Sequence, residues 1–334
     1  MKIIGILGAG TWGTALANCL TNIGHKVTVW SKFESECFTL NESHRHPNLP
    51  GVEINESIVF TSSIFAALRD AEIVIFATPS IFIRETAISA KAYLNPSQII
   101  VTVAKGIEQD TFFTMTEILE DVLGNEYSIT ALSGPTHAEE VSRGIPSTIV
   151  SAGKDLNACK IVQKAFEGTP LRVYTNTDVL GVEICGALKN IIALAAGISE
   201  GLGYGDNAKA AIITRGLAEI TRLGLAMGAE EGTFAGLSGI GDIVVTAISN
   251  HSRNHNAGVL FGQGYRLDYV LEKIGMVVEG INALDAAKQL EEKYQVELPI
   301  IDMVYLVVKK EMDVQLVVPA LFGRKKKNEL KKYN

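Results

Sequence analysis

Short apolar runs rich in β-branched residues recur through the first half of the chain, and helix-forming segments separate them. Several runs lack polar alternation, which is typical of strands that helices cover on both faces. This order predicts βαβ units in a mostly parallel, doubly wound sheet. The expected strands are Ile3–Leu7, Val27–Trp30, Val59–Thr61, Ile73–Ala77, Ile99–Val103, Ile129–Leu132, Thr148–Val150 and Leu171–Tyr174, with helices at Thr14–Ile23 and Phe113–Leu123.

The pattern changes after Asp178, where long segments rich in Ala, Leu, Glu and Ile predict an all-α domain. Asp178 is suited to cap the first of these helices. We therefore expect a Rossmann-type α/β domain over residues 1–177 and an all-α domain over residues 178–334. The expected helices are Val179–Ser199, Ala208–Met227, Asp268–Ile274, Asn282–Tyr294 and Pro299–Lys309.

Three glycines, Gly181, Gly186 and Gly197, interrupt the first helix of this second domain. Each glycine in a helix interior costs about 1 kcal/mol relative to alanine. The usual compensation is close approach of another backbone or of a ligand, and we expect such an approach here.

The composition is consistent with two globular domains, and it argues against a nucleic-acid-binding, secreted or membrane-spanning protein. The 334 residues are 47% apolar and 20% charged, enough for two cores, and the net charge of −7 argues against nucleic-acid binding by the whole surface. Four scattered cysteines indicate a reducing, cytoplasmic environment. The apolar run Ile191–Ile198 is far shorter than the roughly 20 residues of a membrane span. No cleavable signal peptide precedes Ile3, and we expect a cytoplasmic protein without a membrane span.

The last eleven residues, Arg324–Asn334, form a basic tail with six positive residues and one negative residue, so that the rest of the chain carries −12. We interpret this tail as a solvated chain terminus. The alternative is a salt-sensitive attraction to anionic lipid or nucleic acid.

A glycine-rich turn follows the first predicted strand. The sequence Gly8-Ala9-Gly10-Thr11-Trp12-Gly13 opens a helix of small residues, which is the context of a dinucleotide-binding loop. Gly8 allows a tight turn, Gly10 lets backbone N–H groups approach a pyrophosphate, and Gly13 lets helix and strand pack closely. The helix amino terminus favours phosphate. We expect the Trp12 ring to cover the cofactor.

The end of the second predicted strand bears on the choice of cofactor. Sites that prefer NAD place a carboxylate there, which would repel the 2′-phosphate of NADP. Here the strand ends in Trp30-Ser31-Lys32-Phe33, with no carboxylate before Glu34. Because Ser31 and Lys32 favour a phosphate, we predict that NADP(H) is preferred and NAD(H) is the second choice.

Candidate catalytic groups follow two strands and lie within one helix. Lys105-Gly106 and Ser133-Gly134-Pro135-Thr136 follow predicted strands, and therefore face the same crevice as the glycine loop. Lys189-Asn190 lies inside an apolar helix, where desolvation lowers the pKa of a lysine and suits it to acid–base work. The alternative for Lys189 is a structural ion pair with Glu183.

Two further motifs, Gly239-Ile240-Gly241-Asp242 and His251-Ser252-Arg253-Asn254, occur in the second domain. The planar guanidinium of Arg253 suits a bidentate grip on phosphate, and Asn254 adds a donor and an acceptor beside it. The histidine pairs His44/His46 and His251/His255 lack a carboxylate ligand, so we expect no metal site.

Taken in order, these motifs resemble the bacterial-type NAD(P)-dependent glycerol-3-phosphate dehydrogenase family over roughly residues 3 to 323. The resemblance implies an all-α second domain like that of 6-phosphogluconate dehydrogenase, a homodimer, and reversible reduction of dihydroxyacetone phosphate to sn-glycerol 3-phosphate for phospholipid synthesis. Beyond the loop, the motifs are Ala104-Lys105-Gly106, Ser133-Gly134-Pro135-Thr136, Gly186-Ala187-Leu188-Lys189-Asn190, Thr214-Arg215-Gly216, Gly239-Ile240-Gly241-Asp242, Ser252-Arg253-Asn254 and Val277-Val278-Glu279-Gly280.

The resemblance also implies residue roles. Lys189 is the proton donor in reduction and the acceptor in oxidation, and Lys105, Asn190 and Asp242 join it in the catalytic set. The implied cofactor positions beyond the glycines are Thr11, Trp12, Lys32, Lys105, Ala138, Arg253, Val277 and Glu279. The implied substrate positions are Lys105, Gly134, Thr136, Lys189, Asp242, Ser252, Arg253 and Asn254.

Two other functions stay open on the sequence. A β-hydroxyacid dehydrogenase of the 6-phosphogluconate type shares a glycine loop, a helical second domain and an active lysine. A cofactor-sensing binding protein without catalysis is the other alternative, although a buried Lys189 argues against it. For the implied dimer, the apolar helices Val179–Ser199 and Ala208–Met227 are candidates for pairing between subunits.

Overall fold

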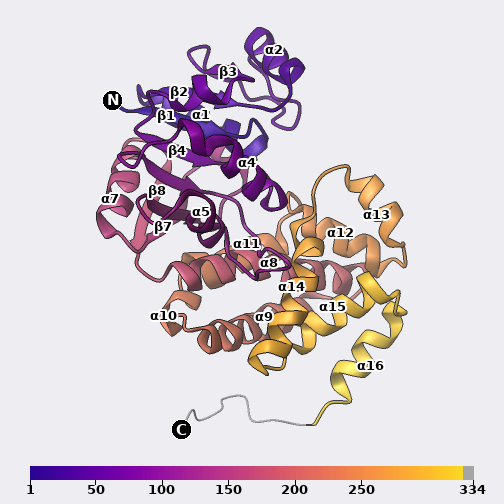
Figure 1. The fold of residues 1–334 in the computed structure, drawn as a ribbon. Coiled ribbons are helices and arrows are strands. Elements are labelled where there is room, and N and C mark those ends of the chain that lie inside the picture. Colours follow the sequence, from indigo (N-terminus) through magenta and orange to yellow (C-terminus); the bar gives the residue numbers. More distant parts are fainter. Residues whose placement is uncertain (326–334) are drawn as a thin grey trace.

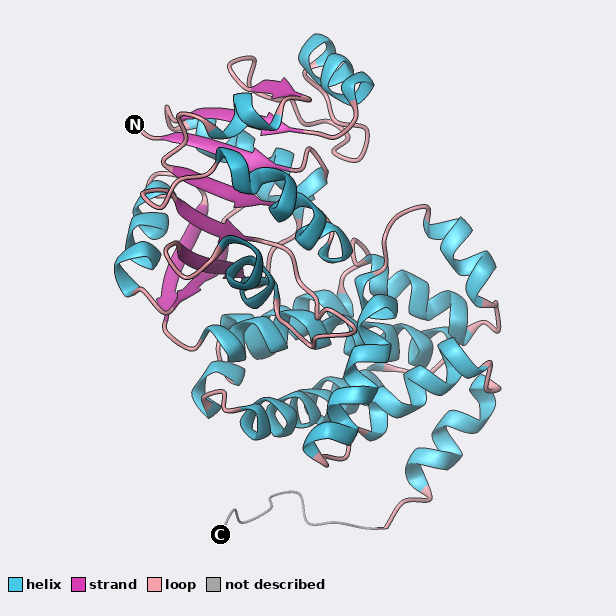
Figure 2. Cartoon of the chain, in the orientation of Figure 1, coloured by secondary structure: helices cyan, strands magenta, loops and turns pink. Residues whose placement is uncertain are grey.

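The computed structural model describes residues 1–325 and shows two lobes, one built on a β-sheet and one of helices only (Figures 1 and 2). The sheet has eight strands in the order β3-β2-β1-β4-β5-β6-β7-β8. All neighbours are parallel except β6 and β7. The strands are β1 (Ile3–Leu7), β2 (Lys26–Trp30), β3 (Val59–Thr61), β4 (Ile73–Phe76), β5 (Ile99–Thr102), β6 (Ser128–Ser133), β7 (Ser147–Gly153) and β8 (Leu171–Asn176).

The mostly parallel, doubly wound sheet predicted from the sequence is confirmed, with each strand at its expected place. Successive residues of a strand face opposite sides of a sheet. Ile6 and Ile75 accordingly belong to one apolar core, and Leu7 and Phe76 to the core on the other face. The helices of this lobe are α1 (Thr11–Asn22), α2 (Glu34–Ser43), α3 (Ile64–Leu68), α4 (Ile83–Ala90), α5 (Met115–Leu123), α6 (Ala138–Ser142) and α7 (Leu156–Ala165), with 3₁₀ turns η1 (Ser80–Phe82) and η2 (Lys91–Tyr93).

The second lobe is all-helical, as predicted. The chain leaves β8 at Asn176, and α8 begins at Val179, where the Asp178 carboxylate accepts a hydrogen bond of 2.9 Å from the Gly181 N–H. The helices of this lobe are α8 (Val179–Gly201), α9 (Asp206–Met227), α10 (Glu231–Phe234), α11 (Asp242–Ile248), α12 (Arg253–Gly262), α13 (Leu267–Ile274), α14 (Glu279–Tyr294), α15 (Pro299–Lys310) and α16 (Val317–Phe322), with the π segment η3 (Leu237–Gly241) and the 3₁₀ turn η4 (Val314–Leu316).

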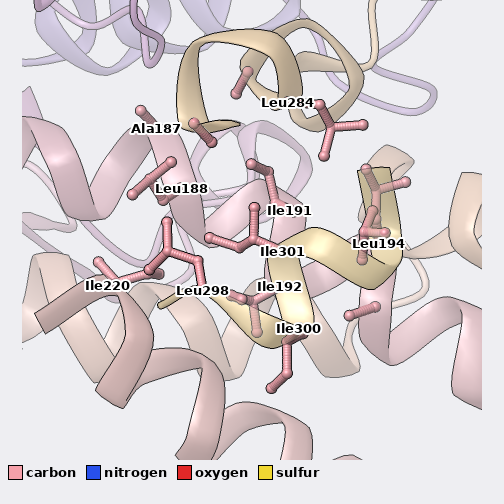
Figure 3. Packing of buried hydrophobic residues seen from close by; sticks show 14 of the residues in the cluster. Ala187, Leu188, Ile191, Ile192, Leu194, Ile220, Leu284, Leu298, Ile300 and Ile301 are labelled. Carbon is pink, nitrogen blue, oxygen red and sulfur yellow. The ribbon is translucent and has the colours of Figure 1, made fainter. Parts of the chain in front are cut away.

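Helix α8 forms the centre of this lobe and packs against α9, α11, α12 and α14. Its residues Leu188, Ile191 and Ile192 are fully buried in the apolar core of the helices (Figure 3). By length and composition alone, α8 could cross a membrane. The apolar run Ile191–Ile198 considered from the sequence is only part of this helix and did not indicate this. Its most apolar window is 89% buried inside the protein, however, so its hydrophobicity is satisfied by neighbouring helices.

Paired glycines let α8 and α12 cross with their backbones in contact. A Cβ on Gly258 of α12 would lie 2.9 Å from the Cα of Gly197 on α8, and closer still to the Leu194 carbonyl oxygen. One turn along, Gly262 faces Gly201 at the same separation. Backbone approach therefore accounts for Gly197, as expected from the sequence.

Candidate active site

The glycine loop joins β1 to α1 and has the shape that a dinucleotide needs. Gly8 has φ +128°, and a Cβ there would lie 2.7 Å from the Ala77 backbone at the end of β4. A Cβ on Gly13 would lie 3.2 Å from Cβ of Ala77, whereas Gly10 has open space around it. No side chain caps the amino terminus of α1. The exposed N–H groups and the open surface at Gly10 fit a bound pyrophosphate.

The two side chains expected to choose the cofactor are both engaged by carboxylates. Lys32 Nζ lies 2.9 Å from a carboxylate oxygen of Glu85, in the first turn of α4. The Ser31 hydroxyl donates to Glu36 in α2. Glu36 and Glu85 both come after Glu34 in the sequence, outside the strand-end motif. In the folded chain their carboxylates lie against Ser31 and Lys32. Trp12 is half-buried and packs against the core beneath the loop.

A buried carboxylate, Asp242, binds the two lysines singled out in the sequence. Its Oδ1 lies 2.5 Å from Nζ of Lys189 on α8, and its Oδ2 lies 2.6 Å from Nζ of Lys105, which follows β5. Lys189 also donates to the Thr246 hydroxyl at 2.7 Å, and Lys105 to the Gly134 carbonyl at 3.2 Å. The cluster therefore joins the sheet lobe to the helical lobe.

Local backbone features explain how the three charges meet. The π segment η3 breaks helical geometry at Gly239, which packs directly on the Phe234 backbone, and α11 begins at Asp242 immediately afterwards. Gly186, one helical turn before Lys189, leaves room for the Lys105 side chain, whose Cγ would lie 3.4 Å from a Cβ there. A larger residue at either glycine would displace the cluster.

The protonation of this cluster is set by burial and by the charges within it. Burial lowers the pKa of Lys189 to about 7, with Asp242 opposing this effect and Lys105 adding to it. Burial by itself would raise the pKa of Asp242, but the charges of the two lysines outweigh it and hold that pKa below its ordinary value. Asp242 is thus anionic near neutral pH, whereas Lys189 can gain or lose a proton there.

Glu183 does not pair with Lys189, so the structural ion pair considered from the sequence is wrong. Its carboxylate instead accepts hydrogen bonds from the Thr116 hydroxyl and from the Thr116 N–H, the latter at 3.0 Å. Six residues separate Glu183 from Lys189, so the two side chains leave α8 in different directions.

Asn190 and Asn254 contact each other rather than an open cavity. The Asn254 amide donates to Asn190 Oδ1 at 3.0 Å and its oxygen accepts from the Gly280 N–H at 2.9 Å. Both side chains are buried. They therefore bind α8, α12 and the start of α14 together. The Ser252 hydroxyl likewise caps α12 by accepting from the His255 N–H at 3.2 Å.

The remaining predicted positions lie around the junction of the lobes. Arg253 is exposed and donates to the Val277 carbonyl at 3.0 Å. Glu279, in the first turn of α14, accepts from the Ser80 N–H at 3.2 Å and from the Ser80 hydroxyl at 2.5 Å. Thr136 donates to the Gly134 carbonyl at 3.3 Å, and Ala138 begins α6. These contacts place Glu279 against the sheet lobe just beyond β4.

Three polar partners were missed in the sequence: Thr246, Ser80 and Thr116. The position of Thr246, four residues after Asp242, was a usable signal, because residues four apart share a helix face. The other two had no local signal, since their partners are far along the chain. Within residues 1–325, no group of three or more His, Cys, Asp or Glu side chains could hold a metal ion.

Comparison with known proteins gives consistent matches over both lobes. Residues 3–159 match the model of the NAD-dependent glycerol-3-phosphate dehydrogenase N-terminus, and residues 178–319 match that of the C-terminus. A glycerol-3-phosphate dehydrogenase [NAD(P)+] 2 of Lactobacillus delbrueckii subsp. bulgaricus is 53% identical, covering 99% of this chain and 100% of the relative. The Bacillus subtilis glycerol-3-phosphate dehydrogenase [NAD(P)+] is 47% identical, covering 99% and 96%.

Solved structures agree with this result. The glycerol-3-phosphate dehydrogenase of Coxiella burnetii has a TM-score of 0.93 at 33% identity, covering 97% of this chain and 99% of that one. A ketopantoate reductase of Ralstonia eutropha, with a TM-score of 0.62 at 16% identity, shares the fold alone.

Proposed function

The chain belongs to the family of NAD-dependent glycerol-3-phosphate dehydrogenases, and we propose that it reversibly reduces dihydroxyacetone phosphate to sn-glycerol 3-phosphate, feeding glycerophospholipid synthesis. The observation that carries this proposal is the Asp242 carboxylate between Lys105 and Lys189, at the junction with the glycine-loop lobe. Relatives named for this activity match the whole chain, which argues against the 6-phosphogluconate-type alternative.

The two lysines are arranged to hold and protonate a carbonyl oxygen. An ammonium has three N–H donors. Asp242 and Thr246 accept two from Lys189, and Asp242 and Gly134 accept two from Lys105, which leaves one donor on each lysine for the substrate. A dinucleotide held through its pyrophosphate at the glycine loop would supply or accept the hydride with its nicotinamide ring. Lys189 gives its proton to the developing oxyanion in reduction and recovers it in oxidation.

Arg253 is the group we assign to the substrate phosphate. Its exposed guanidinium has one hydrogen bond, to Val277, and retains further donors for a bidentate grip. Asn254, which the sequence paired with it, is buried and holds α12 against α8 and α14. We therefore give Asn254 and Asn190 a positioning role beside the substrate.

We also propose that NADP(H) is preferred over NAD(H). Lys32 supplies positive charge where the 2′-phosphate of NADP would lie, and the strand end carries no acid of its own. The 2′-phosphate must replace the Glu85 carboxylate on Lys32, so the preference rests on that exchange. Comparing kcat/KM for NADPH and NADH tests it, and clearly faster turnover with NADH would contradict it.

We also propose that the two domains divide at residues 177 and 178 and that the protein is a cytoplasmic homodimer. The proposal includes no membrane span and no binding of nucleic acid. The basic tail beyond Lys325 lies outside the described part of the chain. Of the two helices considered for subunit pairing, α8 is buried within its own lobe and is unsuitable. Helix α9 keeps exposed residues, among them Ala210, Ala211 and Thr214, and is the remaining candidate. Light scattering after gel filtration measures the oligomeric state.

The deciding experiment follows the absorbance of NADPH or NADH with dihydroxyacetone phosphate as the only other reactant. Oxidation of the cofactor with formation of glycerol 3-phosphate is expected. 6-Phosphogluconate with NADP+ serves as the comparison substrate and is expected to give no turnover. Cofactor binding without turnover on the ketone would favour the cofactor sensor instead.

A further inference from the structure

One histidine at the junction of the lobes has a ring nitrogen without a partner. His137 follows Thr136 in the loop after β6 and immediately precedes α6. Its side chain is half-buried, and its Nε2 is enclosed by the protein yet has no hydrogen-bond partner within residues 1–325. Buried polar atoms are nearly always hydrogen-bonded, so an orphaned nitrogen at a candidate active site indicates a group that arrives with a ligand.

The surroundings of His137 place it beside the proposed acid–base lysine. The charge of Lys189 acts on its ring, and the backbone of Val245 in α11 lies against it. Three residues before His137, the same loop supplies the Gly134 carbonyl that accepts a hydrogen bond from Lys105. His137 therefore lies next to the two amines that hold the carbonyl oxygen in the proposed reaction.

The His137 ring is held in its neutral form. Burial, together with the charge of Lys189, lowers the pKa of His137 below its ordinary value, although Glu139 and Glu140 in the first turn of α6 act against this. A neutral imidazole has one N–H donor and one acceptor nitrogen. A hydroxyl group, which also donates and accepts, matches it, whereas a phosphate is better matched by a cation such as Arg253.

We propose that His137 binds the C1 hydroxyl of dihydroxyacetone phosphate and so helps to determine which ketones the site accepts. This rests on the proposed function, in which the two lysines hold the C2 carbonyl oxygen and Arg253 holds the phosphate on C3. The C1 hydroxyl is then the polar group of the substrate that still lacks a partner. Because C1 is bonded to the carbonyl carbon, its hydroxyl lies close to the lysines, where the orphaned Nε2 is found.

Two phosphorylated ketones that differ in one group test the proposal. Hydroxyacetone phosphate has a methyl group in place of the C1 hydroxymethyl group and keeps the carbonyl and the phosphate. With NADPH as reductant, His137→Phe should lower kcat/KM for dihydroxyacetone phosphate by about tenfold or more, since the hydroxyl would be desolvated without a partner. The same variant should change kcat/KM for hydroxyacetone phosphate little, because that ketone has no C1 hydroxyl to lose a contact.

A conservative variant and a matched control accompany this comparison. His137→Gln places an amide near the position of Nε2, and it should recover most of the kcat/KM that His137→Phe loses with dihydroxyacetone phosphate. His44 also has an enclosed ring nitrogen without a partner in the described chain, but it lies at the end of α2 in a left-handed conformation that suits asparagine. His44→Asn should therefore keep wild-type kcat/KM for both ketones.

Binding can also be measured where no reaction occurs. Calorimetric titration of the NADPH-bound protein with sn-glycerol 3-phosphate reports affinity for the same C1 hydroxyl, and His137→Phe should weaken it by about tenfold. If wild type binds glycerol 3-phosphate in this way but does not reduce the ketone, the proposed function is wrong and the role of His137 in binding stands.

Three results would overturn the role of His137. Equal losses of kcat/KM for both ketones in His137→Phe would assign the nitrogen to the phosphate, which the His137 ring also approaches, since it lies 5.9 Å from the ring of His251, two residues before Arg253. No loss for either ketone would show that the ring only packs. Equal kcat/KM for dihydroxyacetone phosphate in His137→Phe and His137→Gln would exclude a hydrogen bond.

Discussion

Asp242 shows how one residue positions two others. With one oxygen on each lysine, the carboxylate keeps two positive charges close together in a buried site. Removing one partner from such a cluster leaves the remaining charges without compensation, which is strongly unfavourable in a buried environment. The arrangement therefore depends on all three residues, and substitutions within it should affect activity far more than cofactor binding at the glycine loop.

Replacement of Lys189, the acid–base group that we propose, is the most direct test at this scale. Lys189→Ala should lower kcat for ketone reduction by about two to four orders of magnitude, because the proton donor is lost. Cofactor affinity, measured by fluorescence titration, should change little. A variant with near-normal kcat would remove the role assigned to Lys189.

The pH dependence of the two directions follows from the lowered pKa of Lys189. Reduction needs the protonated amine, which prevails below its pKa of about 7, so kcat for reduction should fall as pH rises above that value. Oxidation needs the neutral amine, so its kcat should fall as pH drops below the same value.

Asp242→Asn offers a control for this assignment. The Asp242 carboxylate raises the pKa of Lys189 against the effect of burial. Its removal should therefore move to lower pH both breaks, that is, the pH values at which kcat begins to fall in reduction and in oxidation. Breaks that stay at the wild-type pH in this variant would show that another group titrates.

Arg253 can be tested through the substrate phosphate. Arg253→Ala should lower kcat/KM for dihydroxyacetone phosphate by about 100-fold or more, because a charge-assisted bidentate contact is lost. Unphosphorylated dihydroxyacetone, a poor substrate in both proteins, should show little difference between wild type and variant. An unchanged kcat/KM for the phosphorylated substrate would reject the clamp.

At the scale of elements, the close crossing of helices α8 and α12 at their glycines sets the positions of the site residues. Lys189 and Asn190 lie on α8, and Arg253 and Asn254 begin α12. The two helices can approach this closely only because Gly197 and Gly201 meet Gly258 and Gly262. Separation of these helices would pull Asn254 from Asn190, so helix packing and site geometry are linked here.

A single methyl group tests the crossing. Gly258→Ala should destabilise the protein by about 2 kcal/mol or more, since its Cβ would overlap the α8 backbone, which cannot move aside. Gly232→Ala is the matched control, because Gly232 lies in α10 with open space around it and alanine is the better helix former. Thermal unfolding measures both; equal melting temperatures for the two variants would contradict the steric argument.

At the scale of the whole molecule, polar bonds, one loop and a small apolar cluster of Val150, Ala152 and Val182 connect the lobes. Glu183 on α8 binds Thr116 on α5, and Glu279 binds Ser80. Ile107, in the loop after Lys105, is buried in the core of the helical lobe. The loop is therefore anchored in both lobes, and Lys105 is held between them.

The Glu183 contact makes stability depend on pH. Burial raises the pKa of Glu183 to about 7 from its ordinary 4.5, so the folded state binds a proton more tightly than the unfolded state. Stability should therefore fall as pH rises from about 4.5 through about 7, by at most about 3 kcal/mol from this group. Buried Glu219, whose pKa is also raised to about 7, acts in the same direction.

Glu183→Gln isolates this contribution. The amide keeps an acceptor for the Thr116 N–H and carries no charge, so denaturant unfolding at pH 5 and pH 8 should differ less than in wild type. Glu56→Gln, at an exposed position, should retain the wild-type difference. Identical pH dependence in all three proteins would show that Glu183 does not titrate in this range.

The sequence alone determined the features that depend on neighbouring residues. Short apolar runs rich in β-branched residues located the eight strands, the glycine spacing located the phosphate loop, and its place within an apolar helix marked Lys189. These patterns are readable because strand and helix periodicity place nearby side chains on known faces. Helix α12 was not predicted from the sequence, because its glycines and polar residues have low helix propensity. Its packing against α8 stabilises the helix.

Tertiary structure decided which distant groups meet. Asp242 is 53 residues from Lys189 and 137 from Lys105, and Glu279 is 199 residues from Ser80. No local periodicity relates residues at such separations, so their pairing arises only when the two lobes pack. The same packing assigned Glu183 to Thr116 instead of Lys189, and brought Glu85 to Lys32, because contacts between elements depend on the fold as a whole.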